Sequence, residues 1–198
     1  YLLGNYTCRL RRFDAGGNYL WAYDLGQTVS YGSYVGNYCS AVYVDGSGQI
    51  WLFLPGAVNG YLYTFSQDGT SGPQFSFPDT LGDHAAADPT DNVIYLPGAT
   101  GMDPGSGLAT IWKFTSQGQQ WAASAPATDQ GSILKDAALA ADGSVWAFGN
   151  KGAQLFGMHV AANGTLQWSK SFNTTVNPAN VRVVTRADGG VSTLHWDT

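Results

Sequence analysis

The chain has 198 residues, a formal net charge of −5 and 14 acidic residues, all of them aspartates. The acidic balance argues against a nucleic-acid-binding surface, and no apolar run approaches the roughly 20 residues that a membrane-spanning helix needs. Because glutamate is absent while glycine, tryptophan and tyrosine are abundant, strands and turns are favoured over helices. We expect one all-β domain without nucleic-acid partners and without a transmembrane segment.

The head of the chain predicts two strands of an incomplete sheet. The stretch LRRFDAGGNYLWAYDL places one strand on either side of a glycine turn at residues 15–17. Its alternation puts Arg9 and Arg11 on one face, which is typical of an edge strand protected by charge. The chain begins at Tyr1 with neither an initiator methionine nor a signal-like segment, so we expect a processed or partial chain.

The cysteines and the sequons favour an extracellular protein. Cys8 and Cys39 leave two interpretations open: one disulfide in an oxidising compartment, or two buried thiols. Three Asn-x-Ser/Thr sequons, at Asn5, Asn163 and Asn173, are candidate glycosylation sites. Asn163 precedes a glycine, so its alternative role is that of a hairpin turn residue. We expect a secreted, extracellular protein.

Four aspartate-anchored turns recur along the chain, and an apolar strand follows each of them. The aspartates are Asp45, Asp88, Asp142 and Asp188, at intervals of 43 to 54 residues. A period of about 40–50 residues that holds four strands is typical of propeller blades. The best-formed copy, residues 137–172, contains four short strands joined through Asp-Gly and Asn-Gly turns. The sequence therefore predicts a β-propeller of four-stranded antiparallel blades.

The expected blades span residues 37–81, 82–131 and 132–176, and a fourth is split between residues 177–198 and 1–36. The tail supplies first and second strands and the head supplies third and fourth strands, so the two are complementary. Two architectures remain open: a closed four-bladed propeller with one split blade, or four repeats of a longer array. Closure is favoured because it removes exposed sheet edges.

Two hairpins carry a resemblance to known propellers. GNYLW at residues 17–21 and NGTLQW at residues 163–168 resemble the blade hairpin of quinoprotein-like (PQQ-like) propellers. The longer unit AADGSVWAFGN…LFGMHVAANGTLQWSKSF is similar to bacterial extracellular propeller repeats of the SBBP and delta-60 kind. The resemblance implies the fold through turn glycines and packing aromatics, including Trp146 and Trp168. It implies no single function, because such repeats occur in enzymes, adhesins and binding proteins alike.

Polar residues of the first strands are expected to meet near one mouth of the central channel. Aligning the copies on their turn aspartates brings together Asp83, His84, Lys135, Asp136, Asn180 and Arg182. A pocket of this composition suits an anion, a sugar or a metal ion, and Asp83 with Asp136 is a candidate pair for acid–base chemistry. The alternative is a solvated channel lining with internal ion pairs.

Neither a metal site nor a cofactor platform is evident in the sequence, so no cofactor is predicted. His159 and His195 lack paired ligands at zinc spacing. The segment DPTDN at residues 88–92 predicts a turn stabilised by aspartate side chains rather than a calcium loop. There is no Gly-x-Ser-x-Gly elbow and no phosphate loop.

The expected function is that of an extracellular binding or adhesion propeller, with carbohydrate or protein ligands at the cell surface. An aromatic patch in the connection SYGSYVGNY would stack on sugar rings. Its rings are those of Tyr31, Tyr34 and Tyr38. Two alternatives remain: a structural subunit that self-associates in a cell-surface or filamentous assembly, and a fragment of a quinoprotein-like propeller enzyme.

Overall fold

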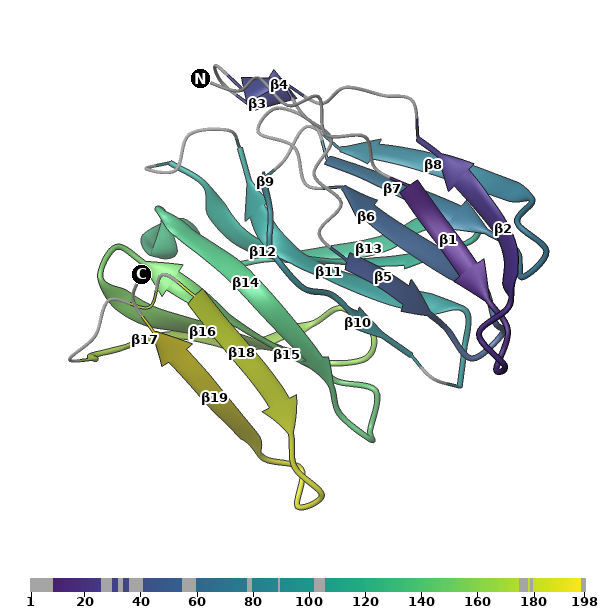
Figure 1. Ribbon diagram of the computed structural model, residues 1–198. Helices are drawn as coiled ribbons and strands as arrows, with labels where there is room; N and C mark the ends of the chain where they lie inside the picture. The colour runs from purple at the N-terminus through teal and green to yellow at the C-terminus, as the bar shows by residue number, and fades with distance from the viewer. Residues whose placement is uncertain are drawn as a thin grey trace.

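The computed structural model is built almost entirely of antiparallel β-sheet (Figure 1). It describes residues 9–25, 30–31, 34–35, 41–54, 60–77, 80–88, 90–101, 106–174, 178 and 180–196. The all-β prediction is confirmed. No helix in this part of the chain is long and apolar enough to cross a membrane.

Three sheets have their strands in meander order, each strand paired with the next along the chain. The first contains β5 (Ala41–Val44), β6 (Ile50–Leu54), β7 (Gly60–Phe65) and β8 (Ser71–Phe77). The second contains β10 (Ala86–Ala87), β11 (Val93–Thr100), β12 (Leu108–Thr115) and β13 (Gly118–Ser124), and β9 (Thr80–Leu81) also pairs with β11. After a short 3-10 helix (Ala127–Asp129), the third contains β14 (Ser132–Leu139), β15 (Val145–Lys151), β16 (Gln154–Val160) and β17 (Leu166–Phe172).

Two-stranded sheets flank the three larger ones. The head hairpin is formed by β1 (Arg9–Phe13) and β2 (Tyr19–Asp24), and the tail hairpin by β18 (Asn180–Thr185) and β19 (Val191–Trp196). A further small pair is β3 (Ser30–Tyr31) with β4 (Tyr34–Val35). In Figure 1 the head hairpin, the three larger sheets and the tail hairpin stand side by side in an arc, in chain order. This is the arrangement of β-propeller blades.

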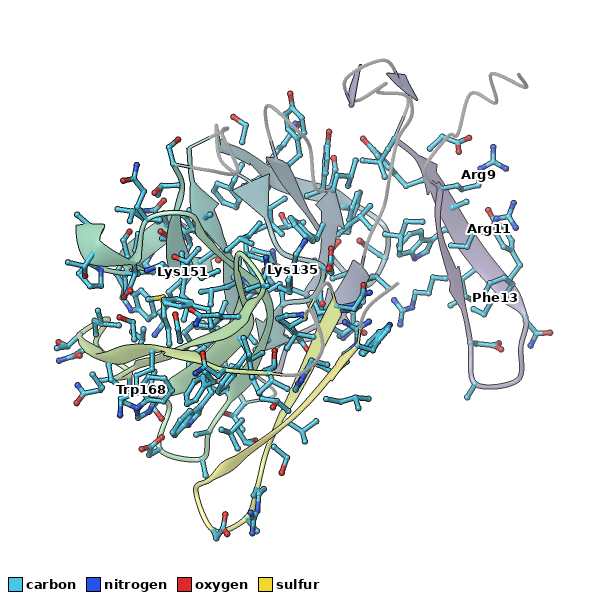
Figure 2. All side chains as sticks on the ribbon, turned by 90° about the vertical axis from the view of Figure 1, so that its left-hand side faces the viewer. Arg9, Arg11, Phe13, Lys135, Lys151 and Trp168 are labelled. Carbon is cyan, nitrogen blue, oxygen red and sulfur yellow. The ribbon has the colours of Figure 1, made fainter. Side chains whose placement is uncertain are left out.

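The head and tail hairpins form separate sheets at opposite ends of this arc (Figures 1 and 2). The head hairpin packs on the sheet β5–β8, where the Tyr23 ring lies 4.8 Å from the Phe65 ring. The tail hairpin packs on β14–β17 through Val181 and Val183. The closed four-bladed ring and the expected blade boundaries therefore stay predictions. At the outer edge of the arc, Arg9 of β1 forms an ion pair with Asp24.

Short turns with one glycine in the left-handed region set the strand spacing. In the turn between β14 and β15, Gly143 has a φ of 80°, and the Asp142 carboxylate accepts hydrogen bonds from the Ser144 backbone N–H (3.0 Å) and hydroxyl (2.7 Å). These bonds lower the pKa of Asp142. Asn163 Oδ1 likewise accepts the Thr165 N–H at 3.0 Å in the turn between β16 and β17, so its role as a turn residue is confirmed.

Replacing Gly143 with Ala is expected to lower the free energy of unfolding by about 1–2 kcal/mol, the cost of placing an L-residue with a Cβ in the left-handed region. Its Cβ would also lie 3.2 Å from the Ala162 Cβ. Chemical denaturation measures the change. Gly143→Asn is the control, since asparagine tolerates this conformation better; equal losses for both variants would contradict the explanation.

The core is divided into clusters between neighbouring sheets rather than gathered in one centre. Trp51 and Phe53 pack against Trp112 and Phe114 of the next sheet, all of them buried. This is expected for blades, which bury each face against a neighbour. Trp168, one of the packing aromatics expected from the sequence, packs against the cluster that contains Val181 and Val183 of the tail hairpin and is partly buried.

Candidate functional site

The first strands of neighbouring sheets are connected to one another, or to the segment before β10, by hydrogen bonds across the sheets. The Lys135 carbonyl of β14 accepts the N–H groups of Asp83 (2.8 Å) and His84 (3.0 Å), in the segment before β10. The strand register shifts between Leu134 and Asp136, so Lys135 is the extra residue of a β-bulge. Gly82 permits the close approach, since a Cβ there would lie 2.6 Å from the Leu134 carbonyl oxygen.

Asp136 is the buried charge of this region, with 5% of its surface exposed. One carboxylate oxygen accepts the Ala137 N–H and the other accepts the Val183 N–H of β18, each at 2.9 Å. Burial raises the pKa of Asp136, and the two hydrogen bonds oppose that rise. Asp136 therefore ties the tail hairpin to β14.

His84 is half-buried and lies within electrostatic reach of three charged side chains. Burial lowers the pKa of its imidazole, and the positive charge of Arg182 lowers it further. The carboxylates of Asp136 and Asp83 act in the opposite direction. The shift to a lower pKa makes the imidazole neutral near pH 7.

Arg182 lies on β18, with an exposed side chain. Its Nη1 donates to the Val181 carbonyl at 3.2 Å, and its guanidinium lies 6.0 Å from the centre of the Trp196 ring. A carbonyl and an aromatic face leave further guanidinium N–H donors for an anion. Arg182 is the cation that influences both His84 and Tyr43.

Tyr43 of β5 completes the group, although sequence reasoning did not select it. Its hydroxyl oxygen accepts the Ala85 N–H at 2.6 Å, which ties β5 to the segment before β10. Burial raises the pKa of Tyr43, and the Asp136 charge raises it further. The signal in the sequence is positional: Tyr43 stands two residues before the turn aspartate of its copy, on a first strand.

Five of the six residues predicted for the channel mouth are thus brought together, and Tyr43 joins them. We call this group the axial cluster: Tyr43, Asp83, His84, Lys135, Asp136 and Arg182. Lys135 Nζ and the Asp83 carboxylate form a loose, partly exposed ion pair at 3.9 Å, which contributes little to stability. Among the interactions of the described residues, none connects the Asn180 side chain to the cluster.

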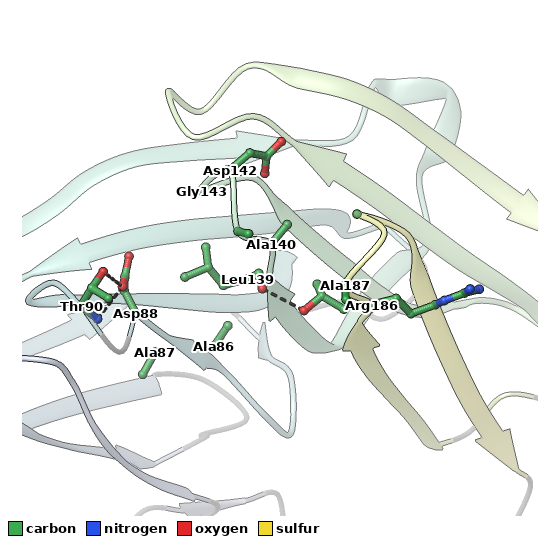
Figure 3. Close-up of a pocket in the computed structure, with 13 residues that line it drawn as sticks. Ala86, Ala87, Asp88, Thr90, Leu139, Ala140, Asp142, Gly143, Arg186 and Ala187 are labelled. Atoms are coloured by element: carbon green, nitrogen blue, oxygen red, sulfur yellow. Dashed lines mark hydrogen bonds between the residues drawn. The ribbon is translucent and has the colours of Figure 1, made fainter.

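A separate cavity of about 730 Å³ lies at the other end of the first strands (Figure 3). Alanines of three sheets line it, including Ala86, Ala140 and Ala187. Its charged residues are engaged elsewhere: Asp88 accepts the Thr90 N–H at 2.8 Å, and in Figure 3 Arg186 points away from the alanines. The predicted side-chain-stabilised turn at Asp88 is confirmed. This cavity was not expected from the sequence, and its lining combines alanines with polar side chains, among them those of Thr90, Asp142 and Thr185.

The other predicted sites lie mostly outside the described residues. These are Asn5, Cys8, Tyr38 and Cys39, together with the side chains of Tyr31 and Tyr34. The disulfide and the aromatic patch therefore stay predictions. Asn163 and Asn173 are exposed, and Asn173 Oδ1 accepts a hydrogen bond from Gln154 at 2.9 Å. Their glycosylation also stays a prediction.

The axial cluster has the components of general-base catalysis. A neutral imidazole accepts a proton, nearby carboxylates stabilise the resulting cation, and an arginine stabilises developing negative charge. In the part of the chain that the structure describes, no group of three or more His, Cys, Asp or Glu side chains is arranged to hold a metal ion.

Comparison with known proteins identifies the fold. No family model and no curated protein sequence matches the chain. Among solved structures, it is similar to virginiamycin B lyase from Staphylococcus aureus (14% identity, 94% of this chain and 56% of that chain, TM-score 0.56). It is also similar to a streptogramin B lyase (14% identity, 96% of this chain and 62% of that chain, TM-score 0.58). A third similar structure is a gluconolactonase from Xanthomonas campestris (17% identity, 94% of this chain and 62% of that chain, TM-score 0.51).

At these identities the likeness shows the fold alone. The chain is a β-propeller, and solved propellers of similar fold include enzymes. The chain spans less than two thirds of the length of each of these structures. The finer resemblance to quinoprotein-like and SBBP-type repeats stays a prediction.

Proposed function

We propose that the protein is a propeller enzyme, or the part of one, that hydrolyses a small ester or lactone at the axial cluster. The observation that carries this proposal is the meeting of His84, Asp136, Arg182 and Tyr43, which come from four different sheets. The pKa values of Tyr43, His84 and Asp136 are each influenced by the charge of Arg182, and Asp136 also acts on Tyr43 and His84. Perturbed ionisable groups that converge from separate elements are typical of catalytic sites.

In the proposed reaction, neutral His84 takes a proton from the attacking water, and Asp136 and Asp83 stabilise the imidazolium that forms. The water oxygen bonds to the ester carbonyl carbon, and the carbonyl oxygen gains the negative charge. Arg182 stabilises this oxyanion, which collapses as the ring or ester C–O bond breaks. The imidazolium returns its proton to the leaving alkoxide.

The fold comparison adds support, since one similar structure is a gluconolactonase. Lactone hydrolysis is the activity of that protein. For the present chain, it is used only to choose the first compounds to test. The proposal favours the enzyme alternative over an extracellular binding or adhesion role. No contact among the described residues supports carbohydrate or protein ligands, so that role and the extracellular location stay predictions.

Replacing His84 with Gln is expected to lower the rate of lactone ring opening by about 100-fold or more, because the general base is lost. The measurement is proton release from δ-gluconolactone and from a panel of larger lactones and simple esters. Because the pKa of His84 is lowered, wild-type activity should persist below the usual titration range of histidine, about pH 6.5.

His195→Gln is the matched control, since His195 lies on β19 outside the axial cluster. It should retain wild-type activity. Equal activity of wild type and His84→Gln, or no acceleration of any compound by a folded wild-type protein, would contradict the proposal. Circular dichroism establishes that each variant is folded.

A further inference from the structure

Tyr43 belongs to the axial cluster, but the proposed hydrolysis assigns no step to its side chain. The residue lies on β5, and its half-buried ring packs against the buried cluster between the sheets β5–β8 and β10–β13. Its partner across the strand pair is Trp51 of β6, which has no exposed surface. These contacts hold the ring in one place, and the hydroxyl at its end reaches the segment before β10.

The Tyr43 hydroxyl is fixed directly beside the backbone of His84. Its oxygen accepts the Ala85 N–H at 2.6 Å, and that N–H belongs to the peptide group that joins His84 to Ala85. The His84 N–H in turn donates to the Lys135 carbonyl at 3.0 Å. The phenol oxygen and the backbone of the proposed base are therefore held in a fixed relation by hydrogen bonds to the main chain.

The bond from Ala85 also restricts where the Tyr43 hydroxyl proton can point. A phenolic hydroxyl both donates and accepts, and here the backbone N–H occupies the accepting side. The O–H proton therefore points away from Ala85. Among the hydrogen bonds of the described residues, none has this hydroxyl as its donor. The proton is available to an oxygen atom of a substrate.

The hydroxyl keeps this proton at neutral pH. Burial raises the pKa of Tyr43, and the negative charge of Asp136 raises it further. The hydrogen bond from Ala85 and the positive charge of Arg182 act in the opposite direction, but the net shift is upward. Because an unperturbed tyrosine already titrates near pH 10, the phenol is a neutral donor wherever a lactone assay is practicable.

Tyr43 and His84 share the same charged neighbours, since Asp136 and Arg182 act on both of them. The Arg182 side chain is exposed, so its guanidinium has freedom to move. The Tyr43 hydroxyl is held by the backbone instead. Donors that are fixed before the reaction, tyrosine hydroxyls among them, stabilise an oxyanion most effectively because they do not have to reorganise.

We propose that Tyr43 is a further catalytic residue, whose O–H donates a hydrogen bond to the carbonyl oxygen of the ester or lactone as that oxygen becomes negative. The proton stays on the phenol throughout, and Arg182 is the second donor to the same oxygen. This inference rests on the proposed hydrolysis. It adds the group that holds the reacting carbonyl beside His84.

The first experiment compares Tyr43→Phe with wild type on the compound that wild type hydrolyses fastest. The variant keeps the ring and removes the donor, so kcat is expected to fall by about 100-fold, as for the loss of one oxyanion donor elsewhere. KM should change by less than about threefold, because the bond strengthens mainly in the transition state. Tyr95→Phe is the matched control: Tyr95 is a buried tyrosine on β11, outside the axial cluster, and this variant should keep the wild-type kcat.

A second variant separates the donor role from the structural role, since Tyr43→Phe also deprives the Ala85 N–H of its acceptor. A ring-fluorinated tyrosine at position 43 keeps the oxygen as an acceptor but makes the phenol more acidic. A phenolate cannot donate to an oxyanion and repels it, so the activity of this variant should fall at a lower pH than that of wild type. A role limited to accepting the Ala85 N–H predicts the same alkaline limit for both proteins.

The outcomes distinguish this inference from the proposed hydrolysis. If His84→Gln loses activity while Tyr43→Phe keeps the wild-type kcat, the role of Tyr43 is overturned and the hydrolysis stands. An unchanged alkaline limit in the fluorinated variant would overturn the role of Tyr43 in the same way. A folded wild-type protein that accelerates no compound would overturn both. Circular dichroism establishes that each variant is folded.

Discussion

Replacing Asp136 with Ala is expected to lower the free energy of unfolding by about 2–6 kcal/mol. The carboxylate accepts the Ala137 and Val183 N–H groups, and each buried N–H left without an acceptor costs about 1–3 kcal/mol. The second of these bonds ties β18 to β14, so the tail hairpin should detach first. Urea denaturation measures the total loss, and amide hydrogen exchange at Val183 measures the local one.

Asp136 also predicts that the free energy of unfolding depends on pH in the direction opposite to that of most aspartates. Burial raises its pKa in the folded protein, so the folded state binds this proton more tightly than the unfolded state does. The stability contribution of Asp136 is therefore present below the usual carboxyl pKa and is lost as the pH rises through the raised value.

Asp136→Asn is the control that isolates this effect. The variant cannot titrate at this position, so the difference in stability between wild type and variant should change with pH in that range. The turn aspartate Asp142, whose pKa is lowered, changes the free energy of unfolding in the opposite direction with pH. It does so equally in wild type and in Asp136→Asn, so its effect cancels in the difference. A difference that does not change between pH 3 and pH 7 would contradict the assignment.

Replacing Phe156 with Ala is expected to destabilise the protein by about 3–5 kcal/mol, the usual cost of truncating a fully buried aromatic ring. Phe156 has no exposed surface and lies in the cluster between the sheets β10–β13 and β14–β17. Because blades are held together through such clusters, the loss should weaken the packing of these two sheets. Thermal and urea denaturation both report the change.

Leu20→Ala is the control for Phe156. Leu20 is about half exposed on the head hairpin, so its truncation should change the free energy of unfolding by no more than about 0.5 kcal/mol. Similar losses for the two variants would contradict the division of the core into inter-sheet clusters.

The sequence predicts the local structure well because its signals are local. The turns at Asp142 and Asn163 depend on residues within four positions of each other, and the structure confirms both. In the copy at residues 137–172, all four strands are found. The first, β14, begins earlier than expected, at Ser132, because its pairing extends along β15.

The axial cluster could be predicted in part, because aligning the repeats on their turn aspartates shows which residues occupy equivalent positions on the first strands. That alignment selected His84, Asp136 and Arg182, which the structure brings within electrostatic reach of one another. It did not select Tyr43, whose role depends on a hydrogen bond to the Ala85 backbone in the next sheet. A contact between two sheets produces no recognisable residue spacing in the sequence of either sheet.

The sequence by itself determined the β-strands, their turns and the propeller architecture, because glycine conformation, side-chain alternation and turn hydrogen bonds act over a few residues. Only the tertiary structure decided which surfaces are covered. The burial of Asp136 and the alanine-lined cavity depend on how whole sheets pack. That packing is the sum of many contacts between residues far apart in the chain, and no short pattern encodes it.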